Sequence, residues 1–429
     1  MLNLSAFPAV EWPRFRLVRQ PILGPSESDI VGAVRREVAR VSHLITPQKT
    51  YAMGLGSRGI ANLNIVAKTT IEEMHRLGAE VVIVPTMGSH GGATPAGQRD
   101  VLESYGITEQ SMGVPIDARM ETDVVAHQAD GTPIYFSRAA LEADGIIPIN
   151  RVKPHTAFHG PIESGIAKML AIGFGKQQGA AAVHTRGFEV FHQVIPEVAQ
   201  ILIERLPVTF GIGLVENGFE ETALIRAIPA DTILQEEAEL LNRAREWMAR
   251  LPFHDVDVLV VGQIGKNISG DGMDPNVTGR YAPAHASYPG PSIGKVAVLN
   301  LTADTHGNAN GLGLADSVSL HAYQEVDWAI TYTNALTSTE FSPIKTPMVM
   351  PNDHDAIEVV LRTINGRDSK HTRTVIIRNT LRLEELAISE ALWEEAEERG
   401  LVALGDWTDL EFNADGNLNS AAGVPIGRQ

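Results

Sequence analysis

The sequence predicts an α/β protein with two domains, each built on a largely parallel sheet. Three observations predict this class. Short segments that are apolar throughout, typical of strands buried on both faces of a sheet, alternate with segments of helical periodicity. The 429 residues exceed what one ordinary hydrophobic core holds together. The apolar share of 44% is that of a globular protein.

The first α/β series occupies roughly the first 250 residues. Its expected strands are the apolar runs at 51–56, 80–86, 133–137, 145–150 and 208–217. Residues 62–78 have apolar positions at helical spacing and predict an amphipathic helix. Thr94 and Pro95 are typical of an N-cap and a first-turn proline, so a helix is expected after them. Thr232 and Gln235 form a capping-box pattern that predicts one more long helix.

A second α/β series follows Leu251-Pro252. Its expected strands lie at 256–262, 295–301, 328–333 and 372–379, and its expected helices at 356–364 and 389–399. We therefore expect a catalytic, cofactor-binding domain over 1–252 and a C-terminal domain over 253–429. The tail after about residue 400, rich in Asn, Gly and Ala, is expected either to be loose or to pack back on the first domain.

Composition excludes several functions. Lys+Arg 35 against Asp+Glu 52 gives a net charge of −17, which disfavours nucleic acid or an anionic membrane surface as the main partner. The chain has no cysteine, so disulfides, thiolate zinc sites and cysteine-bound iron–sulfur clusters are excluded. The first residues do not resemble a signal peptide, and no apolar run is long enough to span a membrane. A cytoplasmic protein is expected.

Polar or glycine-rich loops follow four of the expected strands. They contain Ser57-Arg58, Gly88 to Gly92, Arg151 to His155, and residues 263–274. In open α/β sheets, ligands bind at the carboxyl ends of strands. We therefore expect one active site in a cleft between the two domains.

Three histidines and one lysine in the first domain are the candidates for chemistry: His90, His155, His184 and Lys168. Imidazoles can bind metals and can act as acids or bases near neutral pH. A purely structural role is an alternative interpretation of such residues. His90 can belong to a simple tight turn, and Lys168 can be a helix lysine whose stem covers apolar surface.

Two glycine-rich segments suggest nucleotide binding at first sight. Residues 54–59 match a Gly-x-Gly-x-x-Gly pattern, but the next strand has no acidic residue at its end to hold a ribose. We interpret this segment as a turn with room for a phosphate. Residues 173–179, GFGKQQG, lack the spaced first glycine and the Ser/Thr after the lysine, so they are not a Walker A loop.

Taken together, the candidate residues resemble the nickel-dependent lactate racemase family of 2-hydroxyacid racemases and epimerases. The shared features are Gly88-Ser89-His90 after a strand, Pro154-His155 followed by Gly165-Ile-Ala-Lys168, and a later His184. The likeness covers roughly residues 50–190. Glu163-Ser-Gly-Ile-Ala-Lys168 stands where that family has a Ser-Gly-Gly-Gly-Lys run, which indicates a divergent member.

The resemblance implies a nickel-pincer nucleotide cofactor that brings its own sulfur ligands. Lys168 would attach it covalently and His184 would bind nickel, with Gly88 and Ser89 beside it. His90 and His155 would act as alternating base and acid on the two faces of a small 2-hydroxy acid. The resemblance also implies partner proteins that make and load the cofactor.

Two roles are open at the substrate. Arg58 is a candidate for pairing with the substrate carboxylate or, alternatively, with the cofactor phosphate. Lys266 could supply a second-domain contact to the substrate. Two other classes of function remain open: a hydrolase or lyase with a histidine-bound metal such as zinc, and a non-catalytic member that keeps the fold.

Overall fold

The computed structural model describes residues 4–22, 24–57, 59–282 and 290–426. The chain divides into two compact units, which we call the first unit, Leu23–Met248, and the second unit, Met1–Ile22 with Ala249–Gln429. The division falls between Met248 and Ala249, whereas the expected boundary was residue 252. Residues 1–22, which we expected in the first domain, belong to the second unit instead.

The first unit is built on a five-stranded sheet with the order β3-β2-β6-β7-β8. Its strands are β2 (Thr50–Leu55), β3 (Glu80–Pro85), β6 (Gly145–Arg151), β7 (Phe210–Glu216) and β8 (Thr222–Pro229). All neighbours are parallel except β7 and β8. The expected largely parallel sheet is confirmed, and so are the strands near 51–56, 80–86, 145–150 and 208–217.

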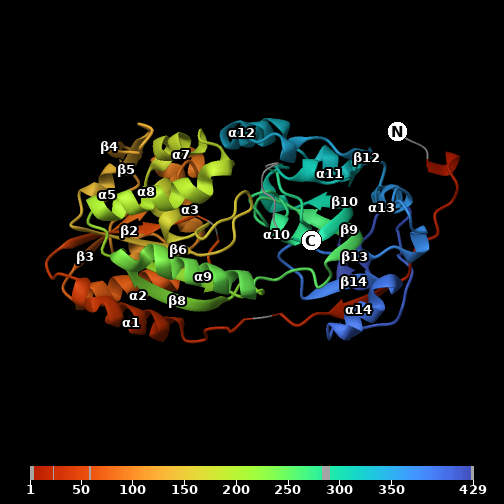
Figure 1. Ribbon diagram of the computed structural model, residues 1–429, viewed down its shortest axis with the longest axis horizontal. Coiled ribbons are helices and arrows are strands. Elements are labelled where there is room, and N and C mark those ends of the chain that lie inside the picture. Colours follow the sequence, from red (N-terminus) through yellow and green to blue (C-terminus); the bar gives the residue numbers. More distant parts are fainter. Residues whose placement is uncertain (1–3, 23, 58, 283–289, 427–429) are drawn as a thin grey trace. The chain divides into compact units, whose positions relative to one another are not determined.

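Helices cover both faces of this sheet (Figure 1). One hydrophobic core joins α1 (Ile30–Val41) and α2 (Leu63–Arg76) to one face. The other core joins α8 (Phe191–Arg205) and α9 (Ile233–Trp247) to the opposite face. Alternate strand residues enter opposite cores, as pleating requires. The other α-helices and strands of the described first unit are α3 (Pro95–Ser104), α4 (Glu109–Met112), α5 (Arg138–Leu141), α6 (Ile166–Lys168), α7 (Lys176–His184) and a separate antiparallel pair, β4 (Thr122–His127) with β5 (Pro133–Ser137).

The second unit has an eight-stranded mixed sheet with the order β12-β11-β10-β9-β13-β14-β1-β15. Its strands are β9 (Asp255–Ile264), β10 (Ser292–Leu301), β11 (Ser317–Ser319), β12 (Met348–Met350), β13 (Thr374–Ile377), β14 (Glu385–Ser389), β1 (Phe15–Arg19) and β15 (Val402–Ala403). Its helices include α10 (Pro275–Thr278), α11 (Leu320–Gln324), α12 (Trp328–Ser338), α13 (Asp353–Arg362) and α14 (Trp393–Glu398). The strands from β12 to β13 are parallel, and β13, β14, β1 and β15 pair antiparallel.

Two local predictions are wrong. Residues 328–333, predicted as a strand, start α12. The Asp327 carboxylate caps this helix by accepting from the N–H of Ile330, and the rings of Trp328 and Tyr332 lie 5.4 Å apart, one helical turn from each other. The cap and this contact outweigh the strand preference of the β-branched residues. The helix predicted after Thr232 is present as α9, but the Thr232 hydroxyl donates to Glu236 instead of forming a capping box.

The C-terminal tail packs on the second unit, not on the first. β15 pairs with β1, and the short hairpin of β16 (Ser420–Ala421) and β17 (Val424–Pro425) contributes to a second-unit core. The Asn300 side chain donates a hydrogen bond to the carbonyl of Ile426, 3.2 Å away. The tail therefore completes the second unit.

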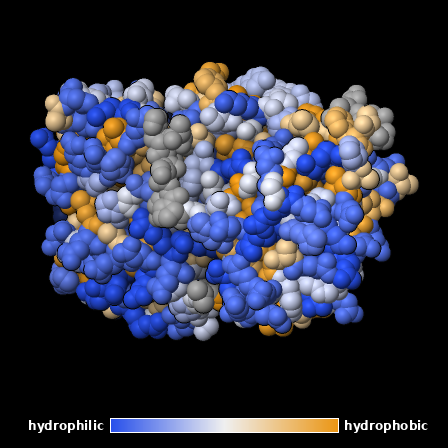
Figure 2. Space-filling model, turned by 45° about the vertical axis from the view of Figure 1, so that its right-hand side comes forward, coloured by the Kyte–Doolittle hydropathy of each residue, from blue (hydrophilic) through white to orange (hydrophobic). Residues whose placement is uncertain are grey.

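The surface is mostly polar. On the face drawn in Figure 2, hydrophilic residues predominate and hydrophobic residues form small separate groups. Within the described part of the chain, the helices are all too short or too polar to cross a membrane.

Candidate functional site

The first unit brings together three of the four candidate residues. His155 lies in the loop after β6, Lys168 ends α6, and His184 ends α7. Nζ of Lys168 and Nε2 of His155 are in hydrogen-bond contact. The positive charge of Lys168 also acts on His184. Three separate segments thus place two imidazoles around one amine.

Three phenylalanines connect these groups. The ring of His155 lies 4.5 Å from that of Phe158, and Nζ of Lys168 lies 5.9 Å from the same ring. The ring of His184 lies 5.5 Å from Phe188 and 5.3 Å from Phe191. Phe191 in turn contacts both of the other phenylalanine rings, at 5.4 and 4.8 Å. The histidines and the lysine therefore share an aromatic, low-dielectric surrounding.

His184 is prepared to act as a neutral ligand. Burial, with a smaller contribution from the charge of Lys168, lowers its pKa to about 4. Its Nδ1 is buried and has no hydrogen-bond partner among the described residues. A neutral imidazole with an unsatisfied buried nitrogen is the form that binds a metal ion.

The tautomer of His155 follows from its backbone contact. The N–H of Ala157 donates to Nδ1 of His155 at 3.0 Å. The neutral ring then carries its own proton on Nε2, the atom that faces Lys168. Covalent attachment through Lys168 would require its uncharged, nucleophilic amine.

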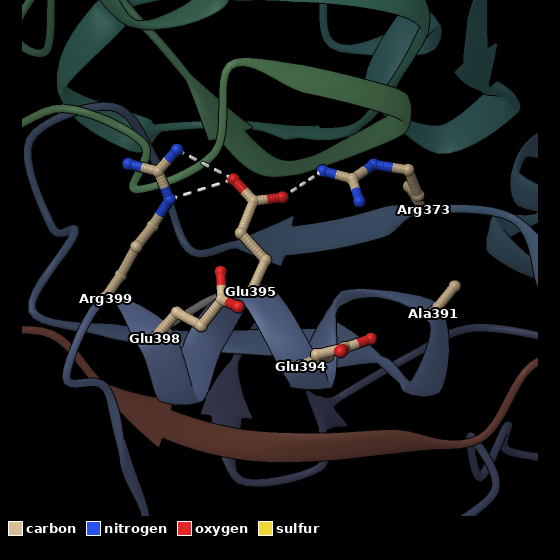
Figure 3. Close-up of a pocket in the computed structure, with 6 residues that line it drawn as sticks. All are labelled: Arg373, Ala391, Glu394, Glu395, Glu398 and Arg399. Atoms are coloured by element: carbon tan, nitrogen blue, oxygen red, sulfur yellow. Dashed lines mark hydrogen bonds and ion pairs between the residues drawn. The ribbon is translucent and has the colours of Figure 1, made fainter.

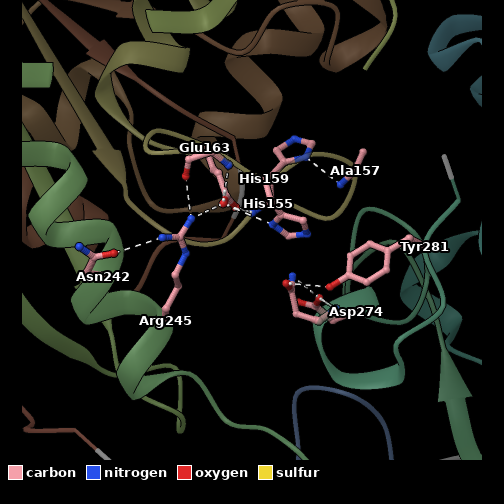
Figure 4. Close-up of polar contacts among 10 residues, drawn as sticks. His155, Ala157, His159, Glu163, Asn242, Arg245, Asp274 and Tyr281 are labelled. Atoms are coloured by element: carbon pink, nitrogen blue, oxygen red, sulfur yellow. Dashed lines mark hydrogen bonds and ion pairs between the residues drawn. The ribbon is translucent and has the colours of Figure 1, made fainter. Parts of the chain in front are cut away.

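A buried carboxylate fixes the loop that carries His155 (Figure 4). Glu163 is fully buried and accepts from the backbone N–H of His155 at 2.6 Å and from that of Gly160 at 3.2 Å. Arg245 reaches from α9 and donates to the same carboxylate at 2.6 Å. Burial alone would raise the pKa of Glu163, but hydrogen bonds from His159, the N–H of His155 and Arg245 hold it below its usual value.

A second buried carboxylate holds the helix that carries Lys168. Glu237 on α9 accepts from the N–H of Ala167 at 2.8 Å. Complete burial raises its pKa to about 8, although hydrogen bonds from Ala167 and Ile166 oppose the shift. Gly165 makes this approach possible, because a Cβ there would lie 2.1 Å from Oε1 of Glu237.

The fourth candidate, His90, lies in the loop after β3. Its side chain is exposed, and its Nδ1 lies 2.5 Å from Oγ of Ser57 in the loop after β2. Gly88 has a φ of +59°, in the left-handed region that favours glycine. Tyr105 fixes the neighbouring loop by donating from its hydroxyl to the carbonyl of Ser57 at 2.8 Å. That His90 faces His155 across a substrate stays a prediction.

Two further residues, Arg58 and Lys266, were expected to contact the substrate. Arg58 lies outside the described residues. Lys266 lies in the loop after β9 of the second unit, where its Nζ donates to the carbonyl of Gly270 at 2.5 Å. The same loop contains Asp274, which accepts from the backbone and side-chain nitrogens of Asn276 at 2.9 Å, while Tyr281 donates to that Asn276. Substrate binding by Lys266 stays a prediction.

The Gly-x-Gly segment has a packing role. A Cβ at Gly54 would lie 2.4 Å from the ring of Phe174, and one at Gly56 would lie 3.0 Å from Oδ1 of Asn150. Asn150 itself donates to the carbonyl of Gly165 at 2.9 Å, just before the helix of Lys168. These two glycines therefore let the segment around Lys168 pack closely against β2.

The cavities of the second unit are poor candidates for an active site. An open cavity of about 500 Å³ is lined by Arg373, Ala391, Glu394, Glu395, Glu398 and Arg399 (Figure 3). Both of its arginines already pair with one carboxylate, since Glu395 accepts from Arg373 at 2.5 Å and from Arg399 at 2.8 Å. A neighbouring cavity that shares Arg373 lies at the amino ends of β9 and β10. Ligands of such sheets bind at the carboxyl ends.

The second unit also contains a group of possible metal ligands on α13. Ligand atoms of His354, Asp355 and Glu358 lie within 4.8 Å of one another. Glu358, however, already forms an ion pair with Arg362. Surface groups of this kind are common without a metal, so we assign no site there.

The residues of the first unit fit a tethered cofactor that carries a metal. Lys168 offers an amine, and His184 offers a neutral imidazole whose Nδ1 is buried without a partner. Two of the phenylalanines beside them, Phe158 and Phe191, are buried in the hydrophobic core of the unit. Sequence reasoning missed Glu163, Glu237 and Arg245. Glu163 lies inside the motif and could have been found there as an acidic residue in an apolar segment.

Comparisons with known proteins agree with this fold. No protein-family profile and no curated protein matches the sequence. Among solved structures, the chain is similar to the lactate racemase apoprotein from Thermoanaerobacterium thermosaccharolyticum, with 12% sequence identity and a TM-score of 0.53. The likeness covers 85% of this chain and 94% of that one. The chain therefore has a lactate racemase-like α/β fold and is divergent in sequence.

Proposed function

We propose that this protein is an isomerase that inverts C2 of a 2-hydroxy acid with a nickel-pincer nucleotide as its cofactor. The observation that carries the proposal is the convergence of His155, Lys168 and His184 from three separate segments of the first unit. The likeness in fold to a lactate racemase apoprotein supports the same class. In this proposal Lys168 tethers the cofactor, His184 binds nickel, and the loop of Gly88 and Ser89 lies beside the cofactor.

The chemistry explains why a cofactor is needed. Inversion requires that the hydrogen on C2 leave one face and return to the other. That hydrogen is a very weak acid, so its removal as a proton is unfavourable at neutral pH. The bound cofactor would supply an acceptor for hydride, which leaves a planar 2-keto acid.

The histidines of the chain would move the hydroxyl proton. One imidazole takes this proton as C2 becomes planar, and an imidazole on the other face returns it after inversion. Nδ1 of His155 accepts from the N–H of Ala157, so Nε2, the atom at the amine of Lys168, is the ring nitrogen left for proton transfer. His90 would serve the opposite face. Arg58 would hold the substrate carboxylate, and Lys266 would contact a second anionic or polar group of the substrate.

Intact mass spectrometry tests the tether directly. The protein is produced together with the proteins that make and load the cofactor. We expect an adduct on the wild-type chain that is lost in Lys168→Ala, with the fold retained, and unchanged in Lys49→Ala, a control at an exposed lysine paired with Asp144. If the adduct persists in Lys168→Ala, the tether assignment is wrong.

Metal analysis of the same preparations separates the alternatives. Nickel together with a pyridinium chromophore supports the racemase. Zinc alone would support a hydrolase or lyase. Cofactor binding without isomerisation of any hydroxy acid would indicate a non-catalytic protein of the same fold.

A further inference from the structure

We propose that Lys176 is a positioning residue that fixes the loop of His90 through a buried chain of hydrogen bonds. The loop comprises residues 86–93. Lys176 begins α7, the helix that ends at His184, so one helix would connect the loop with the nickel ligand. The catalytic meaning of this connection rests on the function proposed above for His90.

The position of Lys176 is unusual for a lysine. Its side chain is completely buried, although lysine is among the residues least often buried. Its φ is +52°, in the left-handed region that non-glycine residues enter only at a cost in free energy. Interactions of the side chain must offset both costs.

The ammonium group of Lys176 has two acceptors. Nζ donates to the carbonyl of Pro85, the last residue of β3, at 2.6 Å. It also donates to Oε1 of Gln98 on α3 at 3.1 Å. Burial lowers the pKa of Lys176 to about 8, while the negative charges of Asp117 and Glu121 oppose this shift. At neutral pH the group is therefore mostly charged and a strong donor.

Gln98 passes this contact on to the loop. It is fully buried, and its Nε2 donates to the carbonyl of Gly88 at 3.0 Å and to that of His90 at 3.4 Å. Because Lys176 occupies Oε1, the amide of Gln98 is held with its nitrogen toward the loop. The orientation of one buried amide thus links the ammonium group to the backbone on both sides of Ser89.

The loop depends on such polar contacts. Thr86 and Met87 are buried, but Gly88, Gly91 and Gly92 all have φ between +59° and +66° and His90 is exposed, so side-chain packing restrains little of the segment from Gly88 onward. Gly91 also packs against the start of α3, where a Cβ would lie 2.4 Å from the carbonyl carbon of Gly97. Release of Gln98 should therefore allow the whole turn to open.

Hydrogen–deuterium exchange on the full-length, cofactor-free protein tests the proposal. The variants are Lys176→Met, Gln98→Leu and the double variant. Lys68→Met is the matched control, because Lys68 also donates to a backbone carbonyl of the first unit, that of Met112 at 3.1 Å. The reporters are the amides of His90 and Ala93, which donate within the loop at 3.1 Å.

We expect exchange at 86–93 to become about tenfold faster in each single variant, with the rest of the first unit unchanged. Because the residues act in series, the double variant should exchange no faster than the faster single variant. The ring signals of His90 in spectra of ¹⁵N-histidine-labelled protein should shift in both single variants, since its contact with Ser57 depends on the loop. Lys68→Met should change none of these readouts.

Three results would overturn the proposal: unchanged exchange at 86–93, additive effects in the double variant, or an equal rise in exchange over the whole first unit. If Lys176→Met does not fold, exchange at 86–93 in Gln98→Leu alone tests the proposal, because this variant removes the hydrogen bonds to the loop. The measurement needs no cofactor. A missing adduct on Lys168 would refute the proposed function alone, and unchanged loop exchange would refute this inference alone.

Discussion

Replacement of the buried Glu237 by glutamine should stabilise the first unit at neutral pH. Burial raises the pKa of this carboxyl from 4.5 to about 8, so the folded protein keeps it protonated while the unfolded chain ionises it. A raised acid pKa means that folded-state stability is lost as pH rises from 4.5 towards 8. Glutamine resembles the protonated acid and has no such dependence.

The size of the effect follows from the pH range between the pKa of the carboxyl in the unfolded chain, 4.5, and its pKa in the folded protein, about 8. Each rise of one pH unit within this range lowers the free energy of unfolding by about 1.4 kcal/mol. Between pH 5 and pH 7, the wild type should therefore lose about 2.5 kcal/mol that Glu237→Gln keeps. The carboxamide oxygen can still accept from the N–H of Ala167, so the helix of Lys168 retains its contact.

Native-state hydrogen exchange of the most protected amides in β6 and β7 measures this free energy for the first unit. Glu239→Gln, at an exposed position of the same helix, is the matched control and should follow the wild type. An equal difference between Glu237→Gln and wild type at pH 5 and pH 7 would refute the assignment of a buried, protonated acid.

Four other outcomes are expected. Gly165→Ala should destabilise the first unit by about 1–3 kcal/mol in urea unfolding, because its Cβ would meet a buried carboxylate at 2.1 Å, whereas Gly405→Ala, with open space around it, should not. In loaded protein, His184→Ala should lower the nickel content measured by elemental analysis more than His90→Ala or His155→Ala does; equal loss in all three would favour a three-histidine site. Replacing either His90 or His155 should slow the reaction in both directions. Substrate deuterated at C2 should keep its label in water, and extensive washout would contradict hydride transfer.

The sequence predicted the parts of the fold that depend on local periodicity. The buried strands β2, β3, β6 and β7 appear as continuous apolar runs, and the loops after them could be located for that reason. The two-sided cover of the first sheet follows from the same pattern. The residues of the candidate site lie in these loops and the short helices that follow them, so three of the four could be expected close together.

The remaining features depend on contacts between distant parts of the chain. Arg245 and Glu163 are 82 positions apart, and Glu237 is 70 positions from Ala167. No local pattern marks such pairs. Lys176 was visible only as part of a segment that is not a phosphate loop, and its burial depends on the packing of β3 and α3. In the same way, residues 1–22 belong to the second unit because their strand β1 pairs with β14, near the other end of the sequence.

The pairing of β1 with β14 determines when each unit can fold during synthesis of the chain. Phe15 of β1 lies opposite Ser389 of β14, 374 positions later. At translation rates of about 5–20 residues per second, the first strand leaves the ribosome roughly 20–75 seconds before its partner exists. The first unit is continuous in sequence and can fold during this interval. The sheet of the second unit can be completed only after nearly the whole chain has been synthesised. Shortening either end of the chain would remove strands from this same sheet.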